Sequence, residues 1–331
     1  MQDKILDAVK RVLASGHFIL GTEVEAFEKE FAAYCNVDYA VGCANGTEAL
    51  YLALKALGIG QGDEVITVSH TSSATICAIR MAGAIPVYVD IEERNYLMNY
   101  DRIQGSITKK TKAIIPVHLY GQMCRMSPII IISRVYKIHI IEDCAQSVGA
   151  GNLSGHIGAY SFYPTKNLGG IGDGGCVITN NKSLAQKIRS LRQYGYKENF
   201  ISEIPDGINS RLDEIQAAVL RVKLKHLDME LKRRWELATF YWEELKDTDL
   251  ILPELKGTFH QYVVRHKKRD ELVKAIGAQI HYPVPCHQQP AYKQDVHLPI
   301  TEKICKEILS LPMRITKDEA KEVCKKIKEI I

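Results

Sequence analysis

The sequence lacks the usual marks of a zinc-binding, secreted or membrane-spanning protein. Its nine cysteines are an odd number and form no Cys-x-x-Cys pair, so neither a zinc site nor a disulfide framework is indicated. The most apolar short run, residues 129–132, is far too brief to cross a bilayer. Residues 1–13 are amphipathic and carry acidic side chains, unlike a signal peptide. We therefore expect a cytoplasmic protein without a membrane partner.

A strong charge of either sign is also absent. The chain has 43 basic and 39 acidic residues, a net charge of +4, which is too small an excess to indicate a nucleic-acid partner but suits an anionic small molecule. His281, His287 and His297 lack the spacing of metal ligands, so we expect no metal. At 331 residues the chain is long enough for two unequal domains.

Strand-like and helical segments alternate through the first two thirds of the chain, which predicts a mostly parallel sheet covered by helices on both faces. We expect a large domain over residues 1–228, beginning with helices, and a smaller C-terminal α+β domain over 229–331. One long helical pattern, continuing to about residue 245, should join the two. The expected strands are residues 39–41, 64–68, 86–89, 113–117, 138–141 and 175–179, and the expected helices include 3–14, 22–34, 49–57, 73–82, 126–136 and 184–194.

Polar residues follow several of these strands, at the edge of a parallel sheet where ligands usually bind. Because the carboxyl ends of parallel strands meet at one edge, we expect these side chains to converge on a single crevice. The residues are His70, Thr71, His118, Tyr120, Asp143 and Gln146.

A glycine-rich run over residues 159–175, AYSFYPTKNLGGIGDGG, contains a single lysine, Lys166. A partly desolvated amine loses its proton more easily and can form a Schiff base with a carbonyl. A loop lysine directed at water is the simpler interpretation. Upstream, however, an apolar strand ends in Asp143, and a lysine with such a carboxylate is what pyridoxal phosphate chemistry requires of a protein. Asp143 could instead be a helix N-cap.

Two further segments have alternative interpretations. Asn45 and Glu48 resemble a capping box, and the first helical turn after Asn45 offers free amides and a hydroxyl that suit a phosphate, although an ordinary cap explains them equally well. The turn over residues 15–21 presents Phe18, which either packs internally or touches a ligand or second subunit. The glycines of residues 170–175 match a dinucleotide-binding pattern but precede a strand, so we reject that interpretation.

Four motifs, EDCAQS, SFYPTKNLGGIGDGG, GINSRLDEIQAA and HYPVPCHQQPAY, together resemble the DegT-type sugar aminotransferases, which depend on pyridoxal 5'-phosphate. The similarity runs from about residue 16 to the end. It implies the aspartate aminotransferase-like fold, fold type I of the pyridoxal phosphate enzymes. It also implies an enzyme of deoxyamino sugar or polysaccharide biosynthesis.

The resemblance also implies roles for individual residues. Lys166 would form the internal aldimine and then move a proton between cofactor and substrate. Asp143 would pair with the pyridine nitrogen, and Gln146 would face the phenolic oxygen of the ring. Asn209 would reach the cofactor phosphate of a neighbouring subunit, which requires a homodimer with shared sites. The residues expected to hold the phosphate in the same chain are Gly46, Thr47 and Ser161.

The implied reaction transfers an amino group from glutamate, through the pyridoxamine form, to the C3 ketone of a dTDP- or UDP-linked keto sugar. The motifs look closest to members that act on 3-keto-6-deoxyhexoses. Phe18, His281 and Tyr282 are candidates for binding the sugar. A C4 aminotransferase acting on a 4-keto-6-deoxy nucleotide sugar and a non-catalytic, pyridoxal phosphate-binding or regulatory homologue remain alternatives. Lys166 argues against the dehydratase branch, whose members carry histidine there.

The sequence departs from the family pattern in three places. Members usually have an aromatic ring that stacks on the cofactor where this chain has Ser72, and His70 is one residue that could compensate. The loop over residues 149–158 and the stretch around 275–279 both look shortened. These changes predict either lower stability or an altered reach for substrate.

Overall fold

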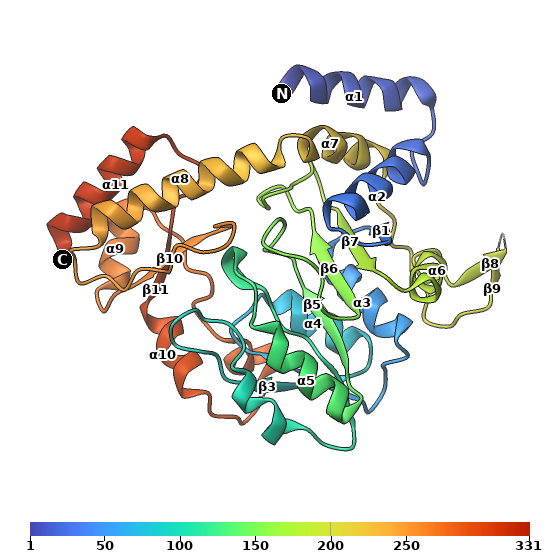
Figure 1. Ribbon diagram of the computed structural model, residues 1–331, viewed down its shortest axis with the longest axis horizontal. Coiled ribbons are helices and arrows are strands. Elements are labelled where there is room, and N and C mark those ends of the chain that lie inside the picture. Colours follow the sequence, from blue (N-terminus) through green and yellow to red (C-terminus); the bar gives the residue numbers. More distant parts are fainter. Residues whose placement is uncertain (199) are drawn as a thin grey trace.

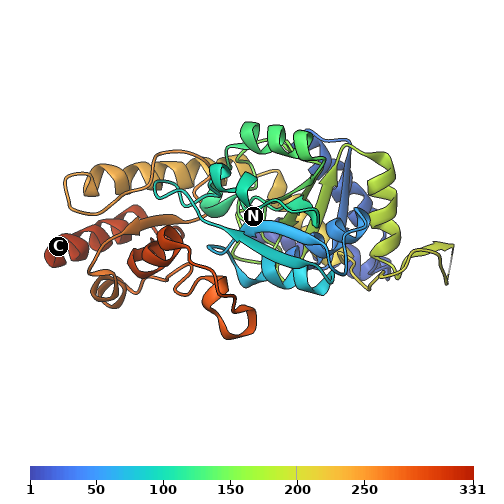
Figure 2. The same cartoon turned by 90° about the horizontal axis from the view of Figure 1, so that it is seen from below.

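The computed structural model describes residues 1–198 and 200–331. A large sheet and its helices form one side of the molecule, and the C-terminal third packs beside them (Figure 1). The view from below shows the same two parts next to one another (Figure 2). The domain boundary at residue 228 stays a prediction.

The large sheet is mostly parallel, as the alternation of strands and helices predicts. Strands β2 to β6 pair in parallel, and β7 lies antiparallel between β6 and β1. Their side chains are almost entirely buried because helices cover both faces. In spatial order the strands are β1 (Tyr39–Cys43), β7 (Gly175–Thr179), β6 (Ile157–Ser161), β5 (His139–Asp143), β4 (Thr111–Ile114), β2 (Glu64–Val68) and β3 (Ile85–Val89).

The helices of this part follow the predicted segments closely. α3 is mostly apolar and packs against α4, β6 and β7, which explains why seven of its eleven residues are buried. α2 begins where Glu214 accepts hydrogen bonds from the amides of Gly21, at 2.9 Å, and Val24, at 2.8 Å. The helices are α1 (Gln2–Ser15), α2 (Thr22–Tyr34), α3 (Gly46–Ala56), α4 (Ser73–Met81), α5 (Met126–Tyr136), α6 (Lys182–Leu191) and α7 (Glu214–Leu224).

The prediction of one continuous helix to about residue 245 is wrong. α7 ends at Leu224, and α8 (Leu227–Leu245) begins after a break at Lys225 and His226. The two helices bury their apolar faces in different places: α7 packs on α1 and α2, whereas α8 packs on α11. Helical periodicity continues across the break, so the sequence pattern alone does not reveal it.

The C-terminal third is built around a two-stranded antiparallel sheet, β10 (Tyr262–Arg265) with β11 (Ile308–Leu311). Tyr241 of α8 and Tyr262 of β10 lie at the centre of its core. Its other helices are α9 (Arg269–Ile276), α10 (Pro299–Glu307) and α11 (Lys317–Ile330). Neither α9 nor β11 was predicted from the sequence.

A short antiparallel pair, β8 (Tyr196–Glu198) and β9 (Ile201–Ser202), projects from the large part (Figure 2).

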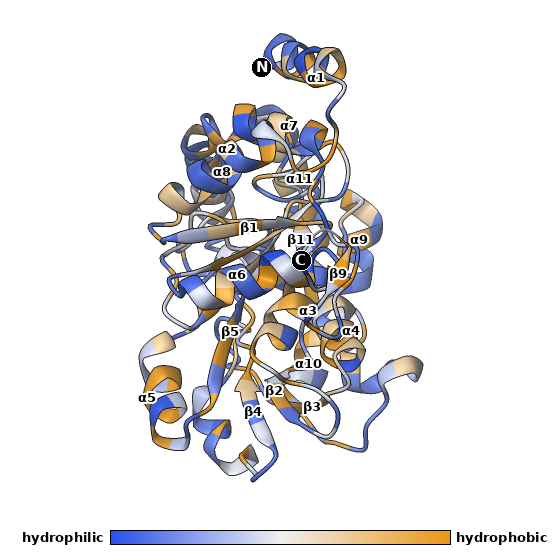
Figure 3. Cartoon of the chain, turned by 90° about the vertical axis from the view of Figure 1, so that its right-hand side faces the viewer, coloured by the Kyte–Doolittle hydropathy of each residue, from blue (hydrophilic) through white to orange (hydrophobic). Residues whose placement is uncertain are grey.

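Short 3-10 turns complete the described secondary structure: Tyr100–Arg102, Gln104–Ser106, Leu119–Gly121, Cys286–Gln288 and Pro290–Tyr292. α1 stands out from the rest at one end of the molecule and shows both apolar and polar faces (Figure 3). Over residues 1–198 and 200–331, the structure contains no helix of the length and apolar character needed to cross a membrane.

Candidate active site

A cavity of about 370 Å³ opens at the carboxyl ends of the central strands. The predicted residues that line it come from segments far apart in the sequence: Gly46, Thr47, Asp143, Gln146, Ser161, Lys166, His281 and Tyr282. Parallel strands deliver their following loops to one edge of the sheet, which explains why the segments from the large part meet, whereas His281 and Tyr282 come from the C-terminal third. The structure therefore places the proposed Schiff-base lysine and the proposed ring-binding acid at the same cavity.

The N-terminus of α3 forms one wall of the cavity. Asn45 caps this helix: its Oδ1 accepts a hydrogen bond of 2.9 Å from the Glu48 amide, and its Nδ2 donates to Glu48 Oε1 at 3.0 Å. The amides of Gly46 and Thr47 belong to the first turn, where no carbonyl of the helix can reach them. A Cβ on Gly46 would lie 2.7 Å from Cβ of Ser161. Glycine thus keeps open a cradle that suits an anionic group such as a phosphate.

Asp143 ends β5, lines the same cavity and is almost completely buried. Its Oδ2 accepts a hydrogen bond of 2.8 Å from Thr75 Oγ1, and its Oδ1 accepts one of 3.1 Å from the Ala145 amide. Burial raises the pKa of Asp143, while these two hydrogen bonds and the charge of Lys166 partly oppose that rise. A buried carboxylate facing a cavity is suited to pair with a cationic ring nitrogen.

Lys166 lies in the loop between β6 and β7, in a turn closed by its amide donating to the Tyr163 carbonyl at 2.8 Å. The turn requires Gly169, because a Cβ there would come within 2.7 Å of the Pro164 carbonyl. Burial lowers the pKa of the Lys166 amine, and attraction to Asp143 partly opposes this. A larger fraction of the amine is therefore uncharged near neutral pH, as a nucleophile requires.

Gln146 links two walls of the cavity. Its Oε1 accepts a hydrogen bond of 2.9 Å from the Tyr120 amide, and its Nε2 donates to the Tyr282 hydroxyl at 3.0 Å. Burial raises the pKa of Tyr282 to about 12, although hydrogen bonds with Gln146 and Ser72 act the other way. Tyr282 is therefore neutral at physiological pH, and its hydroxyl is available for hydrogen bonding.

Three of the polar residues expected in this crevice lie elsewhere. His70, His118 and Tyr120 are buried behind the cavity wall, whereas Thr71, Asp143 and Gln146 do line it. His70 Nε2 is 2.7 Å from the Tyr120 hydroxyl, and burial lowers the pKa of His70 to about 4. His70 thus does not supply the ring that is missing at Ser72. Ser72 itself caps α4, accepting from the Ala74 amide at 3.3 Å.

His118 forms a buried ion pair with Glu142, with 2.7 Å between Nε2 and Oε2. Glu142 neighbours Asp143 on β5, and successive side chains of a strand point to opposite faces, so only Asp143 reaches the cavity. Glu142 also accepts hydrogen bonds from the amides of Ser154, at 2.7 Å, and Gly155. Among the described residues, the potential ligand atoms of His118, Glu142 and Cys144 lie within 4.8 Å of one another, close enough to bind one metal ion. The atoms of the His118–Glu142 pair already bind protein groups, so we interpret the pair as the anchor of the loop over residues 149–158.

Two predicted site residues, Phe18 and Asn209, do not line the cavity of this single chain. Phe18 is 45% exposed, and its carbonyl accepts a hydrogen bond of 2.9 Å from the Glu214 amide. Asn209 is exposed just before α7. The role predicted for Asn209 concerns a neighbouring subunit, so both assignments stay predictions.

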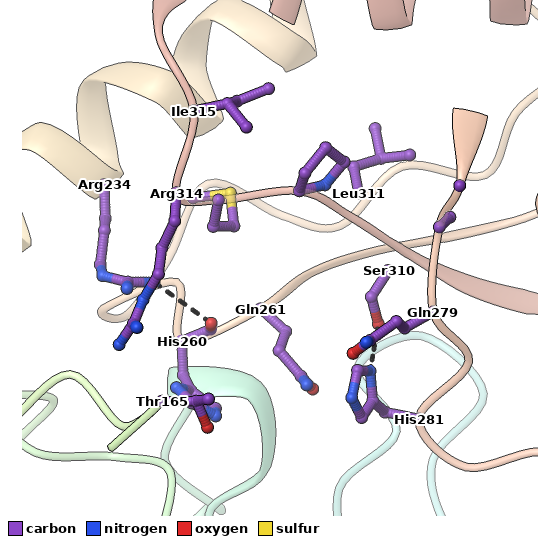
Figure 4. Close-up of a pocket in the computed structure, with 14 residues that line it drawn as sticks. Thr165, Arg234, His260, Gln261, Gln279, His281, Ser310, Leu311, Arg314 and Ile315 are labelled. Atoms are coloured by element: carbon purple, nitrogen blue, oxygen red, sulfur yellow. Dashed lines mark hydrogen bonds between the residues drawn. The ribbon is translucent and has the colours of Figure 1, made fainter. Parts of the chain in front are cut away.

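A second cavity, of about 340 Å³, adjoins the first on the side of the C-terminal third (Figure 4). The two share Thr165, His260, Gln261 and His281. His260 is buried, and burial together with the charge of Lys166 holds its pKa well below the ordinary value. Sequence reasoning missed His260 because it belongs to none of the four motifs and reaches the site only through the packing of β10.

Comparison with known proteins agrees with this geometry. A sequence model of the DegT/DnrJ/EryC1/StrS aminotransferase family matches residues 1–328. The chain belongs to this family. Its aminotransferases depend on pyridoxal phosphate, and the acid, the amine and the anion cradle of the first cavity fit that cofactor. The protein is therefore a pyridoxal phosphate-dependent aminotransferase.

Two relatives and one solved structure illustrate the family. A dTDP-3-amino-3,4,6-trideoxy-alpha-D-glucose transaminase of Micromonospora megalomicea is 42% identical, over 99% of this chain and 94% of the relative. A UDP-N-acetyl-3-dehydro-alpha-D-glucosamine 3-aminotransferase of Acidithiobacillus ferrooxidans is 42% identical, over 95% and 89%. The crystal structure of DesV from S. venezuelae, in complex with a ketimine intermediate, has a TM-score of 0.96 at 40% identity, covering 99% of this chain and 94% of DesV.

Proposed function

We propose that the protein transfers an amino group from glutamate to the C3 ketone of a dTDP- or UDP-linked keto sugar. The observation that carries the proposal is the meeting of Lys166 and Asp143 at one cavity, beside an anion cradle at the start of α3. A regulator that binds no cofactor would need neither group, whereas a homologue that binds pyridoxal phosphate without catalysis would keep both and is separated from the enzyme only by the turnover assay below.

Each residue would perform a simple task. Bound pyridoxal phosphate acts as an electron sink that stabilises negative charge on the substrate carbon. Asp143 would hold the ring nitrogen in its protonated form, and Gln146 would orient the ring. Lys166 would accept and return the proton, for which its lowered pKa suits it. Gly46, Thr47 and Ser161 would hold the phosphate.

The position of amination rests on the relatives, whose names describe 3-amino sugars or a 3-dehydro substrate. The test is to incubate the purified, cofactor-loaded protein with glutamate and a panel of 3-keto and 4-keto dTDP- and UDP-sugars, and to identify products by mass spectrometry and NMR. We expect amination of a 3-keto sugar. Amination of 4-keto sugars alone would establish the C4 alternative. A failure to aminate any of them, despite bound cofactor, would contradict the proposal.

A homodimer with shared sites is supported by the surface. Asn209 lies outside its own chain's cavity, and large apolar side chains are exposed on α1 and the turn after it: Leu6, Leu13, Phe18 and Ile19. Exposed apolar patches of this kind are typical of subunit interfaces.

Mixing two inactive variants tests this arrangement. In the proposed dimer each site takes Lys166 from one chain and Asn209 from the other. A heterodimer of the Lys166→Ala and Asn209→Ala chains therefore has one site that carries both substitutions and one site that carries neither. We expect activity to recover on mixing and subunit exchange. If each site used only its own chain, every site would carry one of the substitutions and mixing would restore nothing.

A further inference from the structure

The second cavity has a strongly basic wall that the roles assigned above do not use. Arg234 of α8 and Arg314, which follows β11, both line it, and the short stretch of residues 277–279 forms part of the opposite side. Figure 4 shows the two guanidinium groups close to one another and to His260. Burial is the main cause that lowers the pKa of Arg234, and the charge of Arg314 adds to it.

Arg234 is almost fully buried, with only 3% of its surface exposed. Its Nη1 donates to the carbonyls of Phe259, at 3.2 Å, and His260, at 3.3 Å. Its Nε has no hydrogen-bond partner among the described residues, and Glu230 Oε1 lies 3.6 Å from it. Burial lowers the pKa of Arg234 to about 10, so the group remains charged at neutral pH. Glu230 therefore gives this cation one partly exposed carboxylate partner, but the buried Nε donor still lacks a hydrogen bond, which is costly.

Arg314 lies at the entrance of the cavity and is exposed. Its Nη2 donates to the carbonyl of Pro164 at 3.0 Å and to the carbonyl of Lys166 at 3.3 Å. The second cavity is thereby connected directly to the backbone of the lysine loop. Glu230 pairs with Arg234, and Arg314 forms no salt bridge among the described residues, so this wall keeps a net positive charge.

We propose that Arg234 and Arg314 form a subsite for an anionic oxygen group, a carboxylate or a phosphate, carried by a substrate whose reacting end reaches Lys166. Guanidinium groups bind such anions with paired, charge-assisted hydrogen bonds. The anion has two possible sources: the distal carboxylate of a dicarboxylic amino donor, or an acidic substituent on the sugar. This inference rests on the proposed function and adds the substrate chemistry of the C-terminal wall.

Calorimetric titration of the cofactor-loaded protein tests the subsite without requiring turnover. Glutarate and its monoamide compare a donor-like diacid with a molecule lacking the distal charge. UDP-glucuronate and UDP-glucose make the same comparison for the sugar. We expect Arg314→Gln to weaken binding of one acidic probe about 10- to 100-fold while leaving its neutral counterpart unchanged. The affected pair identifies the source of the anion.

Two further variants sharpen the test. Arg314→Lys keeps the charge but not the paired geometry, so it should fall between the wild type and Arg314→Gln. Lys317→Gln is the control, because it also removes one positive charge, three residues from Arg314. The Lys317 ammonium group lies over the Phe240 ring, 5.2 Å from its centre. This variant should change the binding of neither acidic probe relative to its neutral counterpart. In turnover, Arg314→Gln should raise the KM of the acidic substrate more than it lowers kcat.

The subsite is overturned if Arg314→Gln weakens neither acidic probe relative to its neutral counterpart, or if Lys317→Gln has the same effect. If the proposed aminotransferase reaction is wrong but the subsite is right, the two experiments give a different combination of results. If no keto sugar is aminated but glutarate or UDP-glucuronate still binds through Arg314, the subsite stands and the proposed reaction does not.

Discussion

The two sides of the active-site region are built differently. On the side of the large sheet, Asp143 and Gln146 each make two hydrogen bonds to neighbouring protein groups, and these groups are buried. On the side of the C-terminal third, Arg234 is also buried and bonded, but Arg314 is exposed and bound only to loop carbonyls. A cofactor common to a whole family needs a fixed wall, whereas a substrate that differs between members can be met by more adaptable side chains. We therefore expect substitutions in the sheet wall to abolish chemistry and those in the C-terminal wall to change substrate choice.

The largest effect should follow Lys166→Ala. Removing the only amine that we place at the reacting carbon should lower turnover at least about 1,000-fold. The visible absorbance of the pyridoxal phosphate-loaded protein should change at the same time, and fluorescence-detected binding should show whether the cofactor is still held. Turnover at wild-type rates would remove the basis for placing the chemistry at this cavity.

Glu142→Gln should have the next largest effect, on stability. It removes the carboxylate partner of a buried histidine, which we expect to cost about 3 kcal/mol of unfolding free energy, measured by urea denaturation.

The pH dependence has a defined sign. Burial alone would lower the pKa of His118, but hydrogen bonds with Cys124 and Glu142 raise it above its ordinary value of 6.5 in the folded state. The pair therefore contributes its full stability below pH 6.5 and loses it as the pH rises through the raised pKa. Glu142→Gln should flatten this alkaline decline. An unchanged decline would show that another group causes it.

Asp143→Asn should separate function from stability. We expect turnover to fall about 100-fold, because an amide no longer holds the ring nitrogen in its charged form. Burial raises the pKa of Asp143, so its ionised form opposes folding of the cofactor-free protein as the pH rises above its ordinary value of 3.8. The cofactor-free variant should therefore be at least as stable as the wild type at pH 7 in thermal denaturation. A less stable variant would mean that Asp143 is mainly structural.

The smallest effect belongs to Ser72. Ser72→Ala removes the cap of α4 and should cost about 1 kcal/mol of stability. Asn181→Ala, which removes the cap of α6 far from the cavity, is a matched control for stability. If Ser72 only caps its helix, both variants should leave the Kd for pyridoxal phosphate unchanged. A weaker Kd in Ser72→Ala alone would show that this residue also supports the cofactor.

Much of the fold follows from local patterns. Short apolar strands alternating with helices predict the parallel sheet, and α2, α5, β2 and β7 begin and end at the predicted residues. The capping of α3 by Asn45 is likewise a local feature and was predicted correctly. The break between α7 and α8 was not, because helical periodicity is the same on both sides of it.

The sequence by itself singled out the groups that we propose to carry the chemistry: a lysine in a glycine-rich loop and an acid at the end of an apolar strand, in motifs whose order resembles one family. Only the tertiary structure decided that Asp143 faces the cavity while Glu142 and His118 face away, since the pleat of β5 separates neighbouring side chains. It alone brought His260, Arg234 and Arg314 beside Lys166, because contacts between residues far apart in the chain arise from packing and leave no periodic pattern in the sequence.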